Sequence, residues 1–447
     1  MAIHRNGHPA RRHADPPGTG RRDLRQSDLM RRVLVLATAL AWAAAAHGQV
    51  APEIRAIHDR VFTFDAHVDI SLSFATAESD PGVDGFEPVD LPKMERGGLD
   101  AAAFAVFASH GPLDETGYAR ALEQARTKAA AIRRMALEMY PRRIGLALTA
   151  DDLRAHASEG RRSALMSMLN AYSLGAAGEH LDEFFAAGVR MVGFTHLGHN
   201  QFADSARPSP QLGDGPALHG GLSDAGRNLV ARLNVLGVII DVSQITEDAL
   251  LQTVALSRAP VVASHVGVKA LVDHPRNLSD RALEAVGSSG GVVHIVAFGS
   301  YLEEPSPERS NAILDLLSRN RRETVEQSEA YFREMREINE RLPGASVSDL
   351  VDQVDYVVEL LGIDHVGLAT DFNHGGGISG WNDEGDAANV TVELVLRGYS
   401  EEDIAKIWGG NFLRVFEQVT ALARPTQPRP AAGHSNGNHP SAPVGLP

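Results

Sequence analysis

The chain of 447 residues contains no cysteine. Disulfide bonds, thiolate nucleophiles and cysteine-ligated zinc are therefore excluded. Positive charge is also scarce, because 57 acidic residues outweigh 42 Lys and Arg and give a formal net charge of −15. The first 32 residues hold eight Arg against three Asp, so the remainder carries −20. A protein this acidic is not expected to have nucleic acid or anionic lipid as its main partner.

Long hydrophobic runs are also missing, since a membrane span takes about 20 apolar residues. The apolar run 33–46 is 14 residues long, follows Arg31-Arg32 and precedes the small-residue pattern at 46–48. This order is typical of a signal peptide, which we assign to residues 30–50, after a non-structural extension at 1–29. We expect Met30 to be the true start and the mature protein to be periplasmic or secreted, without a membrane anchor.

The segment 51–423 alternates short apolar runs with amphipathic stretches, whereas the Pro-, Gly- and Ser-rich tail 424–447 is expected to be disordered. The near-continuous apolar character of the runs is typical of parallel strands covered on both faces. The runs are residues 98–108, 188–196, 236–243, 259–265, 290–298 and 364–372. This alternation predicts an α/β protein with a (β/α)8 TIM barrel. A Rossmann-like sheet is the alternative, but no G-x-G-x-x-G follows the first strand.

One segment breaks the alternation. Residues 303–350 are charged, have a helical pattern and contain no strand-like apolar run. Insertions of this kind are tolerated on barrel loops. We therefore predict a helical insertion at 303–350.

Polar residues gather where the predicted strands end. The stretch TFDAHVDIS places His67 and Asp69 two residues apart, so that on a strand both side chains leave the same face. An imidazole and a carboxylate together suit a divalent metal. Other polar residues at predicted strand ends are His110, His196, His265 and Asp371. Because catalytic groups of a barrel meet at the carboxyl ends of its strands, these residues predict one shared site.

Six sequence motifs together indicate a protein family. They are FDAHVDI, GVRMVGFTHLGHNQFADS, APVVASHVGVKAL, HPRNLSD, DHVGLATDFNHGGG and GYSEEDIAKIWGGNFLRV. In this order, and over residues 61–415, the chain resembles the membrane (renal) dipeptidases of the amidohydrolase superfamily. The resemblance implies a (β/α)8 barrel with a two-zinc site that hydrolyses dipeptides, and it implies a homodimer.

The resemblance also implies roles for single residues. His67 and Asp69 match ligands of the first zinc, and His265 matches a ligand of the second. Asp371 matches the acid/base beside the metals and is a further candidate metal ligand. His196 matches the contact to the substrate carbonyl, and Arg276 matches the residue that holds the substrate carboxylate, for which a guanidinium is well suited.

Two positions depart from the family pattern. Leu169 stands where the family has a glutamate that bridges both metals, and Gln244 stands where it has a histidine for the second metal. The second metal then keeps only His265, although a catalytic zinc ordinarily needs three protein ligands. We therefore predict one zinc ion rather than two, with none as the alternative. His374 and His199 are further candidate ligands, although a loop histidine facing water is the favoured interpretation of both.

The predicted function is that of an exported dipeptidase-like metallohydrolase that acts on dipeptides or on a related small peptide or amide. The matched substrate contacts at His196 and Arg276 favour this interpretation. The alternative is a non-hydrolytic protein of the same fold that binds or tailors a peptide-like molecule in the periplasm. Leu169 and Gln244 favour that alternative.

Overall fold

The computed structural model describes residues 50–320, 322 and 324–423. The extension at 1–29, the assigned signal peptide up to residue 49 and the tail 424–447 lie outside the described residues. The described part contains one parallel sheet. Its strands are β1 (Phe64–Val68), β2 (Ala101–Phe107), β3 (Ile144–Ala147), β4 (Arg162–Leu169), β5 (Val189–Gly193), β6 (Ile239–Asp241), β7 (Val262–Val266), β8 (Val292–Val296) and β9 (Val366–Ala369).

Eight strands form a barrel in the order β1-β2-β4-β5-β6-β7-β8-β9, and β3 pairs with the first half of β4. The barrel closes between β1 and the residues after β9. There the Asp371 N–H donates to the His67 carbonyl at 2.9 Å, and the Asp69 N–H donates to the Phe372 carbonyl at 3.0 Å. The predicted (β/α)8 barrel is confirmed, and its closure joins the segments that carry the candidate ligands.

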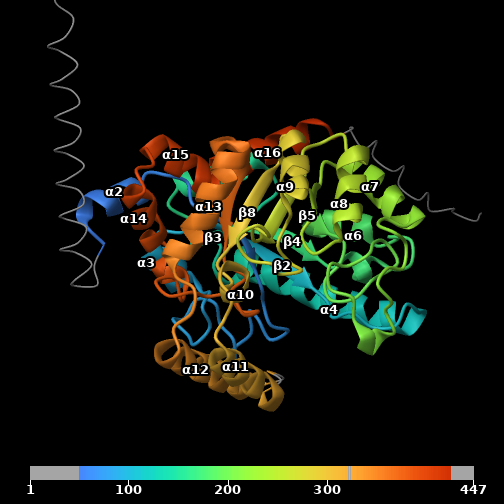
Figure 1. Ribbon diagram of the computed structural model, residues 1–447, viewed down its shortest axis with the longest axis horizontal. Coiled ribbons are helices and arrows are strands. Elements are labelled where there is room, and N and C mark those ends of the chain that lie inside the picture. The colour runs from blue at the N-terminus through green and yellow to red at the C-terminus, as the bar shows by residue number, and fades with distance from the viewer. Residues whose placement is uncertain (1–49, 321, 323, 424–447) are drawn as a thin grey trace, which may run out of the picture.

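Helices surround the strands (Figure 1). They are α2 (Pro52–His58), α3 (Leu91–Gly97), α4 (Glu115–Arg134), α5 (Ala150–Ser158), α6 (Leu181–Ala187), α7 (Asp224–Leu236), α8 (Glu247–Leu256), α9 (Asp280–Ser288), α10 (Gly299–Leu302), α11 (Pro307–Arg319), α12 (Val325–Arg341), α13 (Val347–Leu361), α14 (Ala388–Leu396), α15 (Glu401–Ala405) and α16 (Asn411–Ala421). Local signals set their ends. Ser223 caps the start of α7 by accepting from the Gly226 N–H, and Gly237 ends it at φ 68°, where glycine is unstrained. None of the helices in residues 50–423 that the structure describes combines the length and apolar character needed to cross a bilayer.

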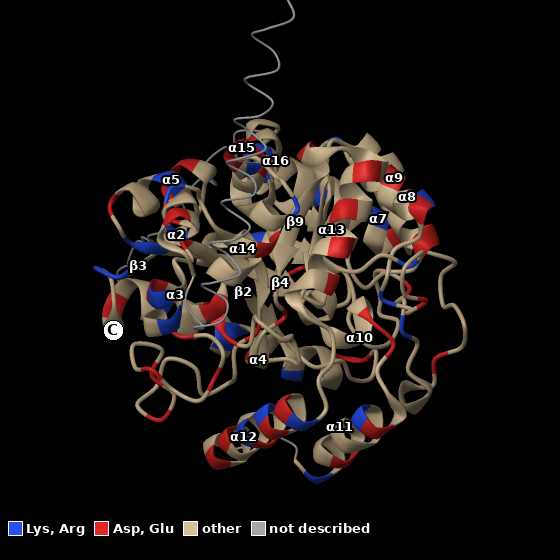
Figure 2. Cartoon of the chain, turned by 60° about the vertical axis from the view of Figure 1, so that its left-hand side comes forward, with Lys and Arg blue, Asp and Glu red and all other residues tan. Residues whose placement is uncertain are grey.

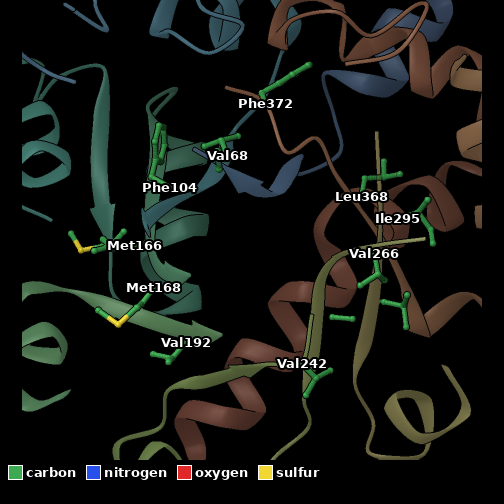
Figure 3. Packing of buried hydrophobic residues seen from close by; sticks show 14 of the residues in the cluster. Val68, Phe104, Met166, Met168, Val192, Val242, Val266, Ile295, Leu368 and Phe372 are labelled. Carbon is green, nitrogen blue, oxygen red and sulfur yellow. The ribbon is translucent and has the colours of Figure 1, made fainter. Parts of the chain in front are cut away.

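Apolar side chains pack on both faces of the sheet. On the outer face, strand residues such as Phe104, Met166 and Val192 join the large cluster shown in Figure 3. On the inner face, α16 closes the amino-terminal end of the barrel, and the ring of its Phe412 stacks on Phe64 with centroids 4.0 Å apart. Truncating a buried phenylalanine costs about 3–5 kcal/mol, so Phe412→Ala would weaken this closure by that order.

Helices α11 and α12 lie between β8 and β9 in the chain, at the end of the barrel opposite α16 (Figure 1). They pack on each other through Leu316, Tyr331 and Ile338. Acidic and basic residues are interspersed along both helices, as the colours of Figure 2 show. Within the segment predicted as an insertion, α13 begins at Val347, and its Leu350 joins the main core. The two helices therefore stand over the end of the barrel that carries the candidate site.

Candidate metal centre

An irregularity in β1 aims the first two candidate ligands. Ala66 packs in the inner cluster and Val68 in the outer cluster, and the pairing of β1 with β2 shifts in register between Asp65 and Val68. Such shifts re-aim side chains and are common beside active sites. Here the shift lets His67 and Asp69 reach the same group of residues.

His67, Asp69 and Asp371 form a buried cluster. One ligand atom from each lies within 4.8 Å of the others. His67 Nε2 is 3.5 Å from Asp69 Oδ2 and 3.7 Å from Asp371 Oδ1. His67 Nε2 and both carboxylate oxygens of Asp69 are buried without a hydrogen-bond partner in the described chain. Buried polar atoms without partners are rare and call for an explanation, and one imidazole with two carboxylates fits a divalent cation.

The three cluster residues shift one another's pKa values in a way that favours a bound cation. Burial works to raise the pKa of Asp69, but the imidazoles of His374 and His67 hold it well below its usual range. Burial works to lower the pKa of His67, but the Asp69 and Asp371 carboxylates raise it. Burial raises the pKa of Asp371, although His374 and His67 oppose this. Two carboxylates therefore surround one imidazole, and a bound cation would replace the proton that this arrangement favours.

His374, expected to be a loop histidine facing water, is partly exposed and also reaches the cluster. Its Nδ1 lies 3.2 Å from Asp69 Oδ2, although without hydrogen-bond geometry, and its side chain is 32% exposed. Its ring also packs near His196, with centroids 5.2 Å apart. His374 is thus the fourth side chain at the cluster and is close enough to orient the Asp69 carboxylate.

The second metal position of the family is occupied by a chain of hydrogen bonds. The His265 ring stacks on His67 with centroids 4.0 Å apart. Ser264 Oγ donates to Asp241 Oδ2 at 2.6 Å and accepts from His265 Nδ1 at 2.7 Å. Because Nδ1 carries the proton, Nε2 of the neutral ring is an acceptor. That acceptor is used by the Gln244 amide nitrogen at 2.9 Å.

Arg207 fixes the orientation of the Gln244 amide. Its Nη2 donates to Gln244 Oε1 at 3.2 Å, and a guanidinium only donates, so the amide nitrogen must point to His265. Burial first, and then the neighbouring His67, hold the pKa of His265 well below its usual range, which keeps the ring neutral. Leu169, at the end of β4, is 3% exposed and has no ligand atom. The nitrogen atoms of His265 are therefore both hydrogen-bonded within the described chain.

Arg276 and His196 lie beside the cluster. Arg276 is 2% exposed, donates from Nη2 to the His265 carbonyl at 3.0 Å, and leaves Nε without a partner in the described residues. The guanidinium thus retains capacity to bind an anion. The His196 ring packs on Phe107 with centroids 4.7 Å apart, and burial holds its pKa well below the usual value.

Two other histidines lie outside the cluster. His110 stacks on Tyr172 with centroids 4.5 Å apart. His199 is buried rather than facing water, accepts from the Ser205 N–H at 3.0 Å and is 2.9 Å from the Gly215 carbonyl through Nε2. Neither side chain belongs to the cluster of His67, Asp69 and Asp371.

Sequence reasoning missed Arg207 and Lys128. Arg207 lies in a loop with no periodic pattern, so no sequence signal identifies it. Lys128 interrupts the apolar face of α4 formed by Ala121, Ala125 and Ala129, and that interruption was a readable signal.

Most of the chain is similar in sequence to known dipeptidases. Residues 51–430 match the model of the membrane dipeptidases, peptidase family M19. The chain is 28% identical over 343 residues to dipeptidase tcpJ of Claviceps purpurea, covering 75% of this chain and 70% of that protein. It is 28% identical over 341 residues to dipeptidase aclJ of Aspergillus oryzae, covering 75% and 71%.

Solved structures show the same likeness. The probable dipeptidase PvdM from Pseudomonas aeruginosa superimposes with a TM-score of 0.74 at 40% identity, over 83% of this chain and 98% of that chain. A metallopeptidase from Rhodobacter sphaeroides, liganded with a phosphinate mimic of L-Ala-D-Ala, shares the fold with a TM-score of 0.64 at 23% identity, over 80% and 99%. The family match over most of the chain, the barrel and the candidate centre lead to one conclusion: this protein belongs to the membrane dipeptidase family, peptidase family M19.

Proposed function

We propose that this protein is an exported metallopeptidase that hydrolyses dipeptides, or a related small peptide or amide, with a single zinc ion held by His67, Asp69 and Asp371. The observation that carries the proposal is the contrast between the two metal positions. At the first, buried ligand atoms of His67 and Asp69 have no partner in the described chain. At the second, the Nε2 of His265 is already used by Gln244.

A bound divalent cation would supply Lewis acidity toward the scissile carbonyl. The residues of the chain would do the rest. Asp371 would accept a proton from the attacking water and pass it to the leaving amine, and burial raises its pKa toward that task. His196, kept neutral by burial, would donate a hydrogen bond to the carbonyl oxygen. Arg276 would hold the substrate carboxylate through its free guanidinium edge.

The test is dipeptide hydrolysis measured with zinc-loaded and chelator-treated protein. We expect turnover that chelation abolishes and that one equivalent of zinc restores. Activity that survives complete removal of zinc would reject the mononuclear mechanism.

A second candidate is a non-hydrolytic protein that binds a peptide-like molecule. The closed chain Arg207–Gln244–His265 favours it, because this chain replaces part of the two-metal machinery. It predicts ligand binding without turnover at any zinc concentration, whereas the hydrolase predicts turnover with one equivalent. The sequence pattern at 30–50 supports export for either candidate. Sequencing the amino terminus of the protein from a periplasmic fraction tests that assignment.

A further inference from the structure

Lys128 is buried where a lysine is least expected. It lies on α4, on the face whose other members Ala121, Ala125 and Ala129 pack into the core. The residue as a whole is only 7% exposed. Lysine is almost never buried at this level unless it is paired with an acid.

No acid pairs with Lys128 in the part of the chain that the structure describes. Its Nζ makes no hydrogen bond or ion pair there, and its contact is with the Phe107 ring, whose centroid is 5.2 Å away. Burial lowers the pKa of Lys128, while the charge of Asp69 acts to raise it. An ammonium on a buried residue without an acidic partner costs stability, and this one faces a cavity, which points to a ligand rather than to packing.

The same lysine lines a cavity that opens onto the candidate metal centre. The cavity has a volume of about 190 Å³, and its wall includes Asp69, His374, Phe107 and Lys128. It adjoins the reacting groups rather than lying apart from them. A substrate held at the centre would therefore extend into it.

A second cation faces this cavity. Arg322, from the connection between α11 and α12, lines it and donates from Nη1 to the Asn373 carbonyl at 2.7 Å. Glu87 is the acid on the wall outside the metal centre, and burial, followed by the charge of Asp90, raises its pKa to about 7. Glu87 is then partly protonated at neutral pH. When a metal neutralises Asp69, the positive charges of Lys128 and Arg322 exceed the partial negative charge of Glu87 in this cavity.

The contacts also show where Arg276 lies relative to the metal ligands and the Lys128 cavity. Arg276 touches the His265 carbonyl, His265 stacks on His67, and His67 neighbours Asp69, which lines the Lys128 cavity. Along this series of contacts, His265, His67 and Asp69 come between Arg276 and the cavity lined by Lys128. If Arg276 holds the carboxyl terminus of a dipeptide, the cavity faces the amino-terminal residue.

We propose that Lys128, assisted by Arg322, binds a carboxylate on the side chain of the amino-terminal residue and so selects acidic dipeptides. This inference rests on the proposed function. It assigns a substrate class to that function and makes Lys128 a specificity-determining residue. It also gives the α11–α12 insertion a role, because the insertion supplies Arg322.

The experiment is calorimetric titration of the zinc-loaded full chain with phosphinate analogues of Glu-Ala and Gln-Ala. The two ligands have the same size and differ in one charge. The variants are Lys128→Met, which keeps the length and removes the charge, and Lys406→Met as a surface control. We expect the wild type and the control to prefer the Glu analogue by about tenfold or more, and Lys128→Met to lose that preference.

Each outcome decides the question. Equal binding of both analogues by the wild type overturns the acidic subsite and leaves the proposed function standing. A preference that persists in Lys128→Met overturns the role of Lys128. Absence of binding by either analogue overturns the proposed function and the subsite together. The melting temperature of Lys128→Met should equal or exceed that of the wild type, because an apolar group replaces an unpaired charge, and a marked decrease would indicate a structural lysine instead.

Discussion

Restoring the two missing ligands should recreate a second metal position. The double variant Leu169→Glu with Gln244→His places a carboxylate at a position that is 3% exposed, and it replaces the amide that now uses the His265 lone pair. Without metal, an uncompensated buried charge of this kind destabilises a protein by about 3–5 kcal/mol. We therefore expect the metal-free variant to melt well below the wild type.

Zinc should reverse most of that loss. A ligand that binds only the folded state at 1,000 times its Kd stabilises by about 4.1 kcal/mol per site. Zinc should therefore stabilise the wild type by one such increment and the double variant by two. Calorimetric melting with and without zinc measures both increments. Gln244→His alone is the control, since it restores an imidazole without the bridging carboxylate. If the double variant binds one zinc and responds to it no more than the wild type, the reasoning about the closed second position is refuted.

Three further predictions follow from single residues. His67→Ala should lose both bound zinc and activity, measured by metal analysis and dipeptide turnover, and undiminished turnover would remove His67 from the mechanism. Arg276→Lys should raise KM about tenfold or more while leaving bound zinc unchanged, because an ammonium cannot form the two-pronged contact with a carboxylate. Burial, and then the charge of Arg55, lowers the pKa of His58 to about 4. In the unfolded chain His58 has its ordinary pKa of about 6.5 and therefore binds a proton more readily than in the folded protein. Protonation then favours unfolding, so about 3 kcal/mol of folding stability should be lost as the pH falls from about 6.5 to 4. Denaturant titrations across that range should show His58→Gln to be less sensitive, and an equal slope would contradict this.

Much of the fold could be predicted from the sequence because short local patterns determine where its strands and helices begin and end. The apolar runs at 188–196 and 364–372 contain β5 and β9, and Ser223 and Gly237 bound α7 as their capping chemistry requires. The meeting of His67 with Asp371 followed from a barrel rule, because the carboxyl ends of all strands converge. These inferences needed only strand order and no side-chain detail.

Other features depended on geometry that no local pattern encodes. The loss of ligands at residues 169 and 244 was visible in the sequence, but the use of the His265 lone pair by Gln244 requires Arg207 to orient the amide from a separate loop. His374 is partly exposed, but the chain closure beside β1 also brings it to Asp69, which the sequence does not reveal. Lys128 on the apolar face of α4 is a local signal, but only the structure shows that this residue lines a cavity with Asp69.

The central claim is that one cation position is open and the other is closed. Its most direct test is the zinc content of the purified full-length protein after equilibration with zinc and removal of the excess, measured by mass spectrometry against protein concentration. The structure predicts about one tightly held zinc per chain, lost in His67→Ala. Two tightly held zinc ions per chain would contradict it.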